Sequence, residues 1–154
     1  MLLKDYIPNI PKNFRKIYFS GISFNSNTIK KGDIFFAIKG NNKDGNNYIA
    51  AATKKGSKII VTEKKIKEKK NGILFIYSKN VRKLLAEVAY KIYNQKPKNL
   101  IAVTGTNGKS SIADFYYQIL NLNNKRVDSI GTLGVKSNKI NFDLPNTTID
   151  PILL

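Results

Sequence analysis

The chain has 154 residues, with 27 Lys or Arg against 10 Asp or Glu, and its formal net charge is +17. It contains no Cys and no His, which excludes disulfides, thiolate zinc sites, Ser-His-Asp triads and imidazole metal ligands. Its apolar content of 42% is that of a globular protein. No apolar run reaches the roughly 20 residues that span a bilayer, and the amino terminus does not resemble a signal peptide. We therefore expect a cytoplasmic protein with no membrane partner.

The positive charge comes almost entirely from lysine. A strongly basic chain often binds nucleic acid, but Arg, which reads bases and grips phosphates with two hydrogen bonds, occurs only 3 times. The densest basic run, Lys64–Lys70, lies between two strand-like segments and indicates a solvated loop or a short helix. We expect a basic surface and no nucleic-acid partner.

The first part of the chain alternates between strand-like and helix-like segments. In chain order we expect strands at 17–24 and 33–38, a helix at 48–55 that ends at Gly56, and strands at 58–61 and 73–77. Asn80 then caps the clearest helix, whose apolar positions recur at the spacing of one buried face; they are Val81, Leu84, Leu85, Val88, Ala89 and Ile92.

A polar stretch with a proline at Pro97 marks a domain boundary. We predict an N-terminal domain at 1–95, a linker at 96–99 and a second domain that begins at 100–154. In the second part we expect a buried strand at Leu100–Val103, a second strand at 127–130 and an irregular segment at 141–154. A helix should carry its apolar residues on one side; these are Ile112, Phe115, Tyr116, Ile119 and Leu120. The predicted fold class is α/β.

The most informative motif is Thr104-Gly105-Thr106-Asn107-Gly108-Lys109-Ser110-Ser111. A strand-like segment precedes it and a helix follows at once, which is the arrangement that binds phosphate with backbone N–H groups and a helix N-terminus. In such a loop Lys109 reaches the β- and γ-phosphates and the Ser110 hydroxyl ligates Mg²⁺. The alternative is a flexible strand–helix turn. The longer loop form has a glycine where this chain has Val103, so the loop is the shorter Gly-x-x-Gly-Lys-Ser form.

This shorter loop resembles the ATP-binding loop of the Mur ligases. Further segments resemble the N-terminal UDP-binding domain of that family, above all the ligases that add a diamino acid to UDP-N-acetylmuramoyl-L-alanyl-D-glutamate. They are Ser23–Asn27, Lys31–Gly40 and Asp44-Gly45. The family's Asp-Ser-Arg segment is Asn25-Ser26-Asn27 here, which keeps the serine and loses both charged neighbours. The resemblance implies a small N-terminal α/β domain followed by the start of a doubly wound ATP-binding domain.

The resemblance also implies site residues. ATP would contact Gly105, Thr106, Asn107, Gly108, Lys109, Ser110 and Ser111, with Lys109 catalytic and Ser110 on the metal. The UDP-linked substrate would contact Phe24, Ser26, Asn41, Asn42, Lys43, Asn146, Thr147 and Thr148. Each has a plainer interpretation, because Ser26 could cap a turn and residues 146–148 could form an ordinary polar loop.

The implied reaction is an ATP-dependent ligation in peptidoglycan synthesis. ATP would phosphorylate the D-glutamate carboxylate of UDP-N-acetylmuramoyl-L-alanyl-D-glutamate, and a diamino acid would attack the acyl phosphate. The implied cofactors are ATP and Mg²⁺, and we expect a monomer. Residues 98–154 lack the strands to complete a doubly wound domain. We therefore expect an N-terminal fragment, from a truncated gene or a partial record, that is inactive by itself.

Other hypotheses remain open at this stage. Another Mur-type ligase or a folylpolyglutamate synthase shares the ATP loop, although segment 17–61 argues against the synthase. A module that only binds a UDP-sugar is a second alternative. A basic nucleic-acid-binding domain is a third, and the scarcity of Arg counts against it.

Overall fold

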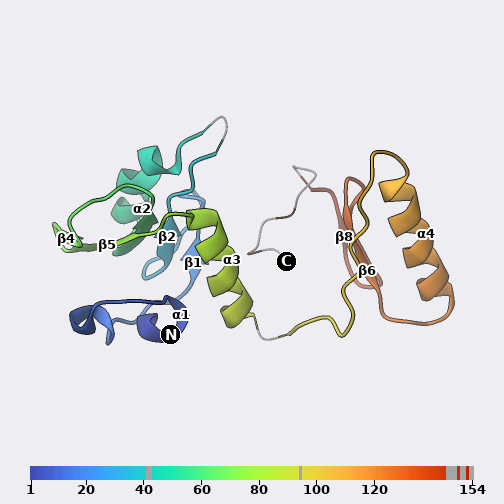
Figure 1. Ribbon diagram of the computed structural model, residues 1–154, viewed down its shortest axis with the longest axis horizontal. Coiled ribbons are helices and arrows are strands. Elements are labelled where there is room, and N and C mark those ends of the chain that lie inside the picture. Colours follow the sequence, from blue (N-terminus) through green and yellow to red (C-terminus); the bar gives the residue numbers. More distant parts are fainter. Residues whose placement is uncertain (41–42, 94, 145–148, 150–151, 153–154) are drawn as a thin grey trace. The chain divides into compact units, whose positions relative to one another are not determined.

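The computed structural model describes the chain except for residues 41–42, 94, 145–148, 150–151 and 153–154. The chain divides into two compact units, Met1–Asn94 and Gln95–Leu154 (Figure 1). Among the described residues, none of the helices combines the length and the apolar character of a bilayer-spanning segment.

The first unit is built on a sheet with the strand order β1-β2-β3-β5-β4. Its strands are β1 (Ile22–Ser23), β2 (Ile34–Phe36), β3 (Ile59–Thr62), β4 (Lys69–Lys70) and β5 (Ile73–Tyr77). Strands β1, β2, β3 and β5 run parallel, and β4 pairs antiparallel to β5 at one edge. The helices are α1 (Leu3–Tyr6), η1 (Lys12–Phe14), η2 (Gly45–Tyr48), α2 (Ile49–Lys54) and α3 (Val81–Ile92). This parallel sheet with helices confirms the predicted α/β class.

Strands β2 and β3 are buried on both faces, which explains why they are continuous apolar runs. Phe35 and Ile60 are neighbours across the two strands and pack with Ala52 of α2 in one core cluster. Side chains alternate along a strand, so Phe36 and Val61, which are also fully buried, point to the opposite face. Helix α3 contacts β2 and α1 contacts α3, and Figure 1 shows α3 alongside β1 and β2.

Helix α3 begins where the sequence predicts. The Asn80 side chain accepts a hydrogen bond of 2.8 Å from the backbone N–H of Lys83, which satisfies one of the free donors of the first turn. Five of the six predicted face positions are buried, from Val81 to Ala89. The predicted helix and its core-facing side are therefore confirmed.

Two expectations for the first unit are wrong in detail. The run Lys64–Lys70 is neither all loop nor helix, because Lys69 and Lys70 form β4. This edge strand has both side chains exposed, so lysine there keeps its charge in water and leaves no apolar signal. Only Ile22 and Ser23 of segment 17–24 join the sheet, and Tyr18 makes an isolated bridge to Leu2 instead.

The second unit contains one helix and one small sheet. Helix α4 (Lys109–Leu122) is followed by β6 (Asp128–Gly131), β7 (Gly134–Ser137) and β8 (Asn141–Phe142). The three strands form an antiparallel sheet in chain order, and α4 contacts β6. The prediction of an irregular segment at 141–154 is thus wrong at its start, where Asn141 and Phe142 pair with β7.

The predicted buried strand at Leu100–Val103 is not formed. In the described part of the second unit the sheet consists of β6, β7 and β8 alone, so segment 100–103 has no strand to pair with. Leu100 is 86% exposed and Ile101 is 58% exposed. An apolar run becomes a buried strand only where neighbouring strands satisfy its backbone groups and cover its side chains.

Helix α4 has the predicted apolar side, but that side is exposed. Ile112, Phe115, Tyr116 and Ile119 are each between 45% and 62% exposed, and the helix has no buried residue. This agrees with the expectation that residues 98–154 cannot cover their own apolar surfaces.

Candidate functional site

The candidate phosphate loop is an exposed turn that leads directly into α4. Residues 104–110 are all exposed, and Gly108 is the N-cap of the helix with φ 74° and ψ −4°. This left-handed conformation strains residues that have a Cβ, and no atom lies within 4 Å of a Cβ built on Gly108. Glycine is thus required by the backbone angles and not by crowding.

The first turn of α4 is suited to an anion. Gly108 has no side chain to cap the helix, and the first turn contains no acidic residue. The N–H groups of Lys109, Ser110 and Ser111 precede the first intrahelical bond, which Ile112 donates to the Gly108 carbonyl at 2.9 Å. These donors and the positive end of the helix dipole favour a phosphate at this terminus.

Lys109 folds back over the loop. Its Nζ donates to the carbonyl oxygen of Thr106 at 3.2 Å and also to that of Gly105. An ammonium has three donors, so one remains for an anion that the loop would hold. Thr106, Asn107 and Ser111 lie on the same exposed stretch, so the structure brings all seven predicted ATP-loop residues together.

The Ser110 hydroxyl is 2.7 Å from the Thr132 hydroxyl, in the turn between β6 and β7. Among the described residues, no group of three or more acidic, His or Cys side chains could hold a metal. Mg²⁺ in nucleotide sites is commonly held by phosphate oxygens and water with only one or two protein ligands. One serine hydroxyl therefore fits Mg²⁺ that arrives with a nucleotide, and not a metal that the described residues hold alone.

A second group of predicted residues lies in the first unit, where β1 and β2 end. Parallel strands end at the same edge of a sheet, and open α/β sheets bind ligands there. Phe24 and Ser26 follow β1, and Lys43 follows β2. Phe24 is 37% exposed, Ser26 is 8% exposed and Lys43 is exposed. Asn41, Asn42, Asn146, Thr147 and Thr148 lie outside the described residues.

The turn after β1 is held by its own polar groups. The Ser23 hydroxyl donates to the Asn25 carbonyl at 3.0 Å, and the Asn25 side chain accepts from the Asn27 N–H at 2.8 Å. Asn25, which stands where the resembled family has Asp, therefore serves as a turn residue here. This turn fixes where Ser26 lies.

The segment after β2 is fixed by Asp44 and Gly45. Asp44 caps η2 by accepting from the backbone and the side chain of Asn46 at 2.8 and 2.7 Å. These hydrogen bonds lower the pKa of Asp44, with smaller contributions from the charges of Lys64 and Lys39. A Cβ on Gly45 would lie 2.6 Å from the backbone of Ile38, so only glycine allows this close approach.

Sequence reasoning missed Thr62 and Asn46 at the same edge. Thr62 ends β3 and is fully buried, and its hydroxyl donates to the Asn46 side-chain oxygen at 2.6 Å. The same hydroxyl accepts from the Lys64 N–H at 3.1 Å. A polar residue at the carboxyl end of the apolar run Ile59–Val61 was the available signal. These bonds tie the end of β3 to the segment after β2.

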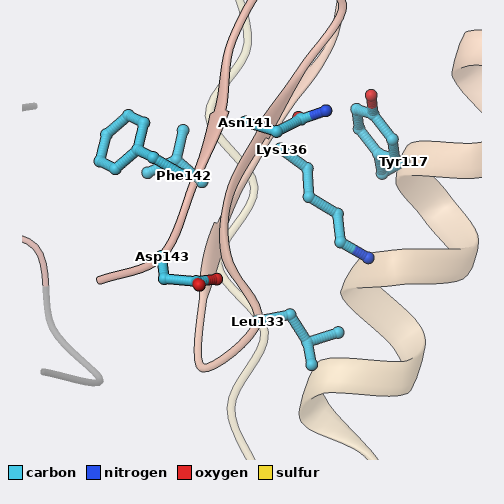
Figure 2. Close-up of a pocket in the computed structure, with 7 residues that line it drawn as sticks. Tyr117, Leu133, Lys136, Asn141, Phe142 and Asp143 are labelled. Carbon is cyan, nitrogen blue, oxygen red and sulfur yellow. The ribbon is translucent and has the colours of Figure 1, made fainter. Parts of the chain in front are cut away.

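A pocket of about 370 Å³ lies in the second unit, and Figure 2 shows its lining. The lining residues are Tyr117, Leu133, Val135, Lys136, Asn141, Phe142 and Asp143. The Lys136 Nζ forms a salt bridge of 2.5 Å with the Asp114 Oδ1 of α4. Hydrogen bonds from Lys136 and then Gln118 lower the pKa of Asp114. None of the predicted site residues lines this pocket.

The comparison with protein families identifies the class of this chain. Residues 18–102 match the family described as "Mur ligase family, catalytic domain". The match covers more than half of the chain, which therefore belongs to the Mur ligase family, as its residues predicted. The matched segment spans the sheet of the first unit and ends just before the phosphate loop.

Two relatives show which members of the Mur ligase family this chain is similar to. The chain is 45% identical over 149 residues to the UDP-N-acetylmuramoyl-L-alanyl-D-glutamate–2,6-diaminopimelate ligase of Rickettsia montanensis, with 92% of this chain and 30% of that protein covered. The ligase of the same name from Clostridioides difficile (strain 630) is 35% identical over 158 residues, with 99% and 32% covered. The chain thus spans about a third of the length of these relatives.

Solved structures show the same fold. A UDP-N-acetylmuramoyl-L-alanyl-D-glutamate–2,6-diaminopimelate ligase matches with a TM-score of 0.76 at 23% identity, over 99% of this chain and 31% of that one. The MurF ligase of Thermotoga maritima in complex with ADP matches with a TM-score of 0.53 at 28% identity, over 68% and 23%.

Proposed function

We propose that this chain is the N-terminal part of an ATP-dependent ligase that joins a diamino acid to UDP-N-acetylmuramoyl-L-alanyl-D-glutamate. The observation that carries the proposal is the loop at 104–111, with its left-handed Gly108, its uncapped helix terminus and the ammonium of Lys109 folded over it. The names of the relatives support 2,6-diaminopimelate as the diamino acid. Because ATP and UDP-linked precursors are cytoplasmic metabolites, we place the activity in the cytoplasm, with a monomer as the working unit.

Each unit has a separate task in this proposal. In the second unit, backbone N–H groups at 105–111 and the Lys109 ammonium bind the phosphates and offset the charge that develops during phosphoryl transfer. Ser110 supplies an oxygen ligand to Mg²⁺, which neutralises phosphate charge when bound. In the first unit, Phe24, Ser26 and Lys43 at the edge of the sheet hold the UDP-linked substrate. Asn41, Asn42, Asn146, Thr147 and Thr148 complete the proposed substrate contacts.

ATP binding is tested by titrating the ¹⁵N-labelled chain with ATP and Mg²⁺. We expect the amide signals of residues 105–111 to shift, and we expect Lys109→Ala to weaken binding at least tenfold because it removes a charge-assisted hydrogen bond. Lys125→Ala is the matched control, since Lys125 is an exposed lysine just after the same helix. Equal binding by the chain and its Lys109→Ala variant would show that the loop is only a structural turn.

Substrate binding is tested separately with the UDP-linked dipeptide and Ser26→Ala. We expect this change to weaken binding of the UDP-linked dipeptide several-fold, the effect of one lost hydrogen bond, and to leave ATP binding unchanged. Ser20→Ala is the control, because Ser20 precedes β1 and so lies toward the opposite end of that strand. If both serine variants bind like the unchanged chain, Ser26 has no role in the substrate site.

A further inference from the structure

Thr132 connects the β6–β7 turn to the phosphate loop. Its Oγ1 lies 2.7 Å from the Ser110 Oγ, and either hydroxyl could donate in this bond. The two residues are 22 positions apart in the chain but belong to elements that pack together, because α4 contacts β6. Gly131 and Gly134 pair across the hairpin, which fixes the two-residue turn where Thr132 lies.

When a cation binds Ser110, the chemistry of a hydroxyl determines which of the two groups donates this hydrogen bond. A serine hydroxyl has one proton and two lone pairs. An oxygen that gives a lone pair to Mg²⁺ must point its proton away from the metal, toward an acceptor. For Ser110, the Thr132 Oγ1 lies at the right distance, 2.7 Å, to be that acceptor.

We propose that Thr132 is a positioning residue of the nucleotide site, which accepts a hydrogen bond from the Ser110 hydroxyl and thereby leaves a Ser110 lone pair to face Mg²⁺. This inference rests on the nucleotide site proposed above. Thr132 does not touch the metal itself. It acts through Ser110, so its removal affects the part of nucleotide affinity that depends on Mg²⁺.

The test compares ATP affinity in excess Mg²⁺ and in EDTA, by calorimetry or amide shifts of the 154-residue chain. For Thr132→Val, which keeps the shape and removes the hydroxyl, we expect threefold to tenfold weaker binding in Mg²⁺, about the effect of one hydrogen bond. In EDTA its affinity should equal that of the unchanged chain. Thr132→Ser keeps a hydroxyl at this position and should bind ATP in Mg²⁺ as the unchanged chain does. Ser129→Ala, which removes a hydroxyl from β6 of the same hairpin, should have no effect.

A double-mutant cycle with Ser110→Ala isolates the mechanism. Once Ser110 is alanine, Thr132→Val should cause no further loss. An equal loss of affinity in Mg²⁺ and EDTA, no loss at all, or an additive loss in the cycle would each overturn the positioning role. Failure of the unchanged chain to bind ATP would instead overturn the nucleotide site itself. The two failures are distinguishable, because the second is seen before any variant is made.

Discussion

Single residues set the boundaries of the helices in this chain. Asn80 and Gly108 both stand one residue before a helix, but they act differently. Asn80 caps α3 with its side chain, whereas Gly108 leaves the first turn of α4 without a side-chain cap. The capped terminus stabilises α3, and the uncapped one leaves the first N–H groups of α4 without a side-chain partner.

Removal of the Asn80 cap should destabilise the first unit. We expect Asn80→Ala to lower the free energy of unfolding by about 1 kcal/mol, since it leaves the Lys83 N–H without its side-chain partner. Urea denaturation followed by far-UV circular dichroism measures this. Asn99→Ala, at an exposed position in the second unit, is the matched control and should unfold at the unchanged urea concentration. An equal shift for both variants would contradict the capping role.

At the scale of elements, polar contacts join α4 to its hairpin. Asp114 on α4 binds Lys136 on β7, while Phe115 and Ile119 remain exposed. Within the described residues from 95 onward, Gly134 alone is buried. The packing of α4 on the hairpin should therefore respond to charge more than an apolar interface would.

The Asp114–Lys136 contact should make the stability of the second unit depend on pH in the acid range. The pKa of Asp114 is lowered in the folded chain, so its stabilising effect is present above the unfolded carboxyl pKa of about 3.9. That effect is lost as the pH falls through the folded value. We expect the dispersed amide signals of β7 to collapse at a higher pH in Asp114→Asn than in the unchanged chain. Asp128→Asn, an exposed acid on β6, is the control. The same acid midpoint in all three proteins would show that the ion pair contributes nothing.

At the scale of the whole molecule, the two units differ in how much apolar surface they cover. The first unit fully buries large apolar side chains, including Phe35, Phe36 and Leu85. The second unit leaves Leu100, Ile101 and most of the apolar side of α4 exposed. The first unit therefore has what a domain needs to fold alone, and we propose a boundary at 96–99 between the substrate-binding and ATP-binding parts.

Residues 1–95 should fold without the remainder of the chain. We expect this piece to unfold in one cooperative thermal transition, with a near-UV signal from its tyrosines, because the central strands β2 and β3 are buried on both faces. Differential scanning calorimetry and near-UV circular dichroism measure this. Residues 96–154, prepared in the same way, should show a weaker and broader transition. A featureless melt of residues 1–95 would place the boundary elsewhere.

The sequence by itself determined the features that depend on local interactions. Helix α3 with its Asn80 cap, strand β5 at Ile73–Tyr77 and the glycine loop before α4 follow from spacing, capping and backbone freedom, and the family follows from the loop and the N-terminal segments. Only the tertiary structure decided which apolar runs are buried. Ile34–Phe36 has β1 and β3 on either side, whereas Leu100–Val103 has no neighbouring strand among the described residues. The contacts of Thr62 with Asn46 and of Ser110 with Thr132 join residues far apart in the chain, and only the fold brings these partners together.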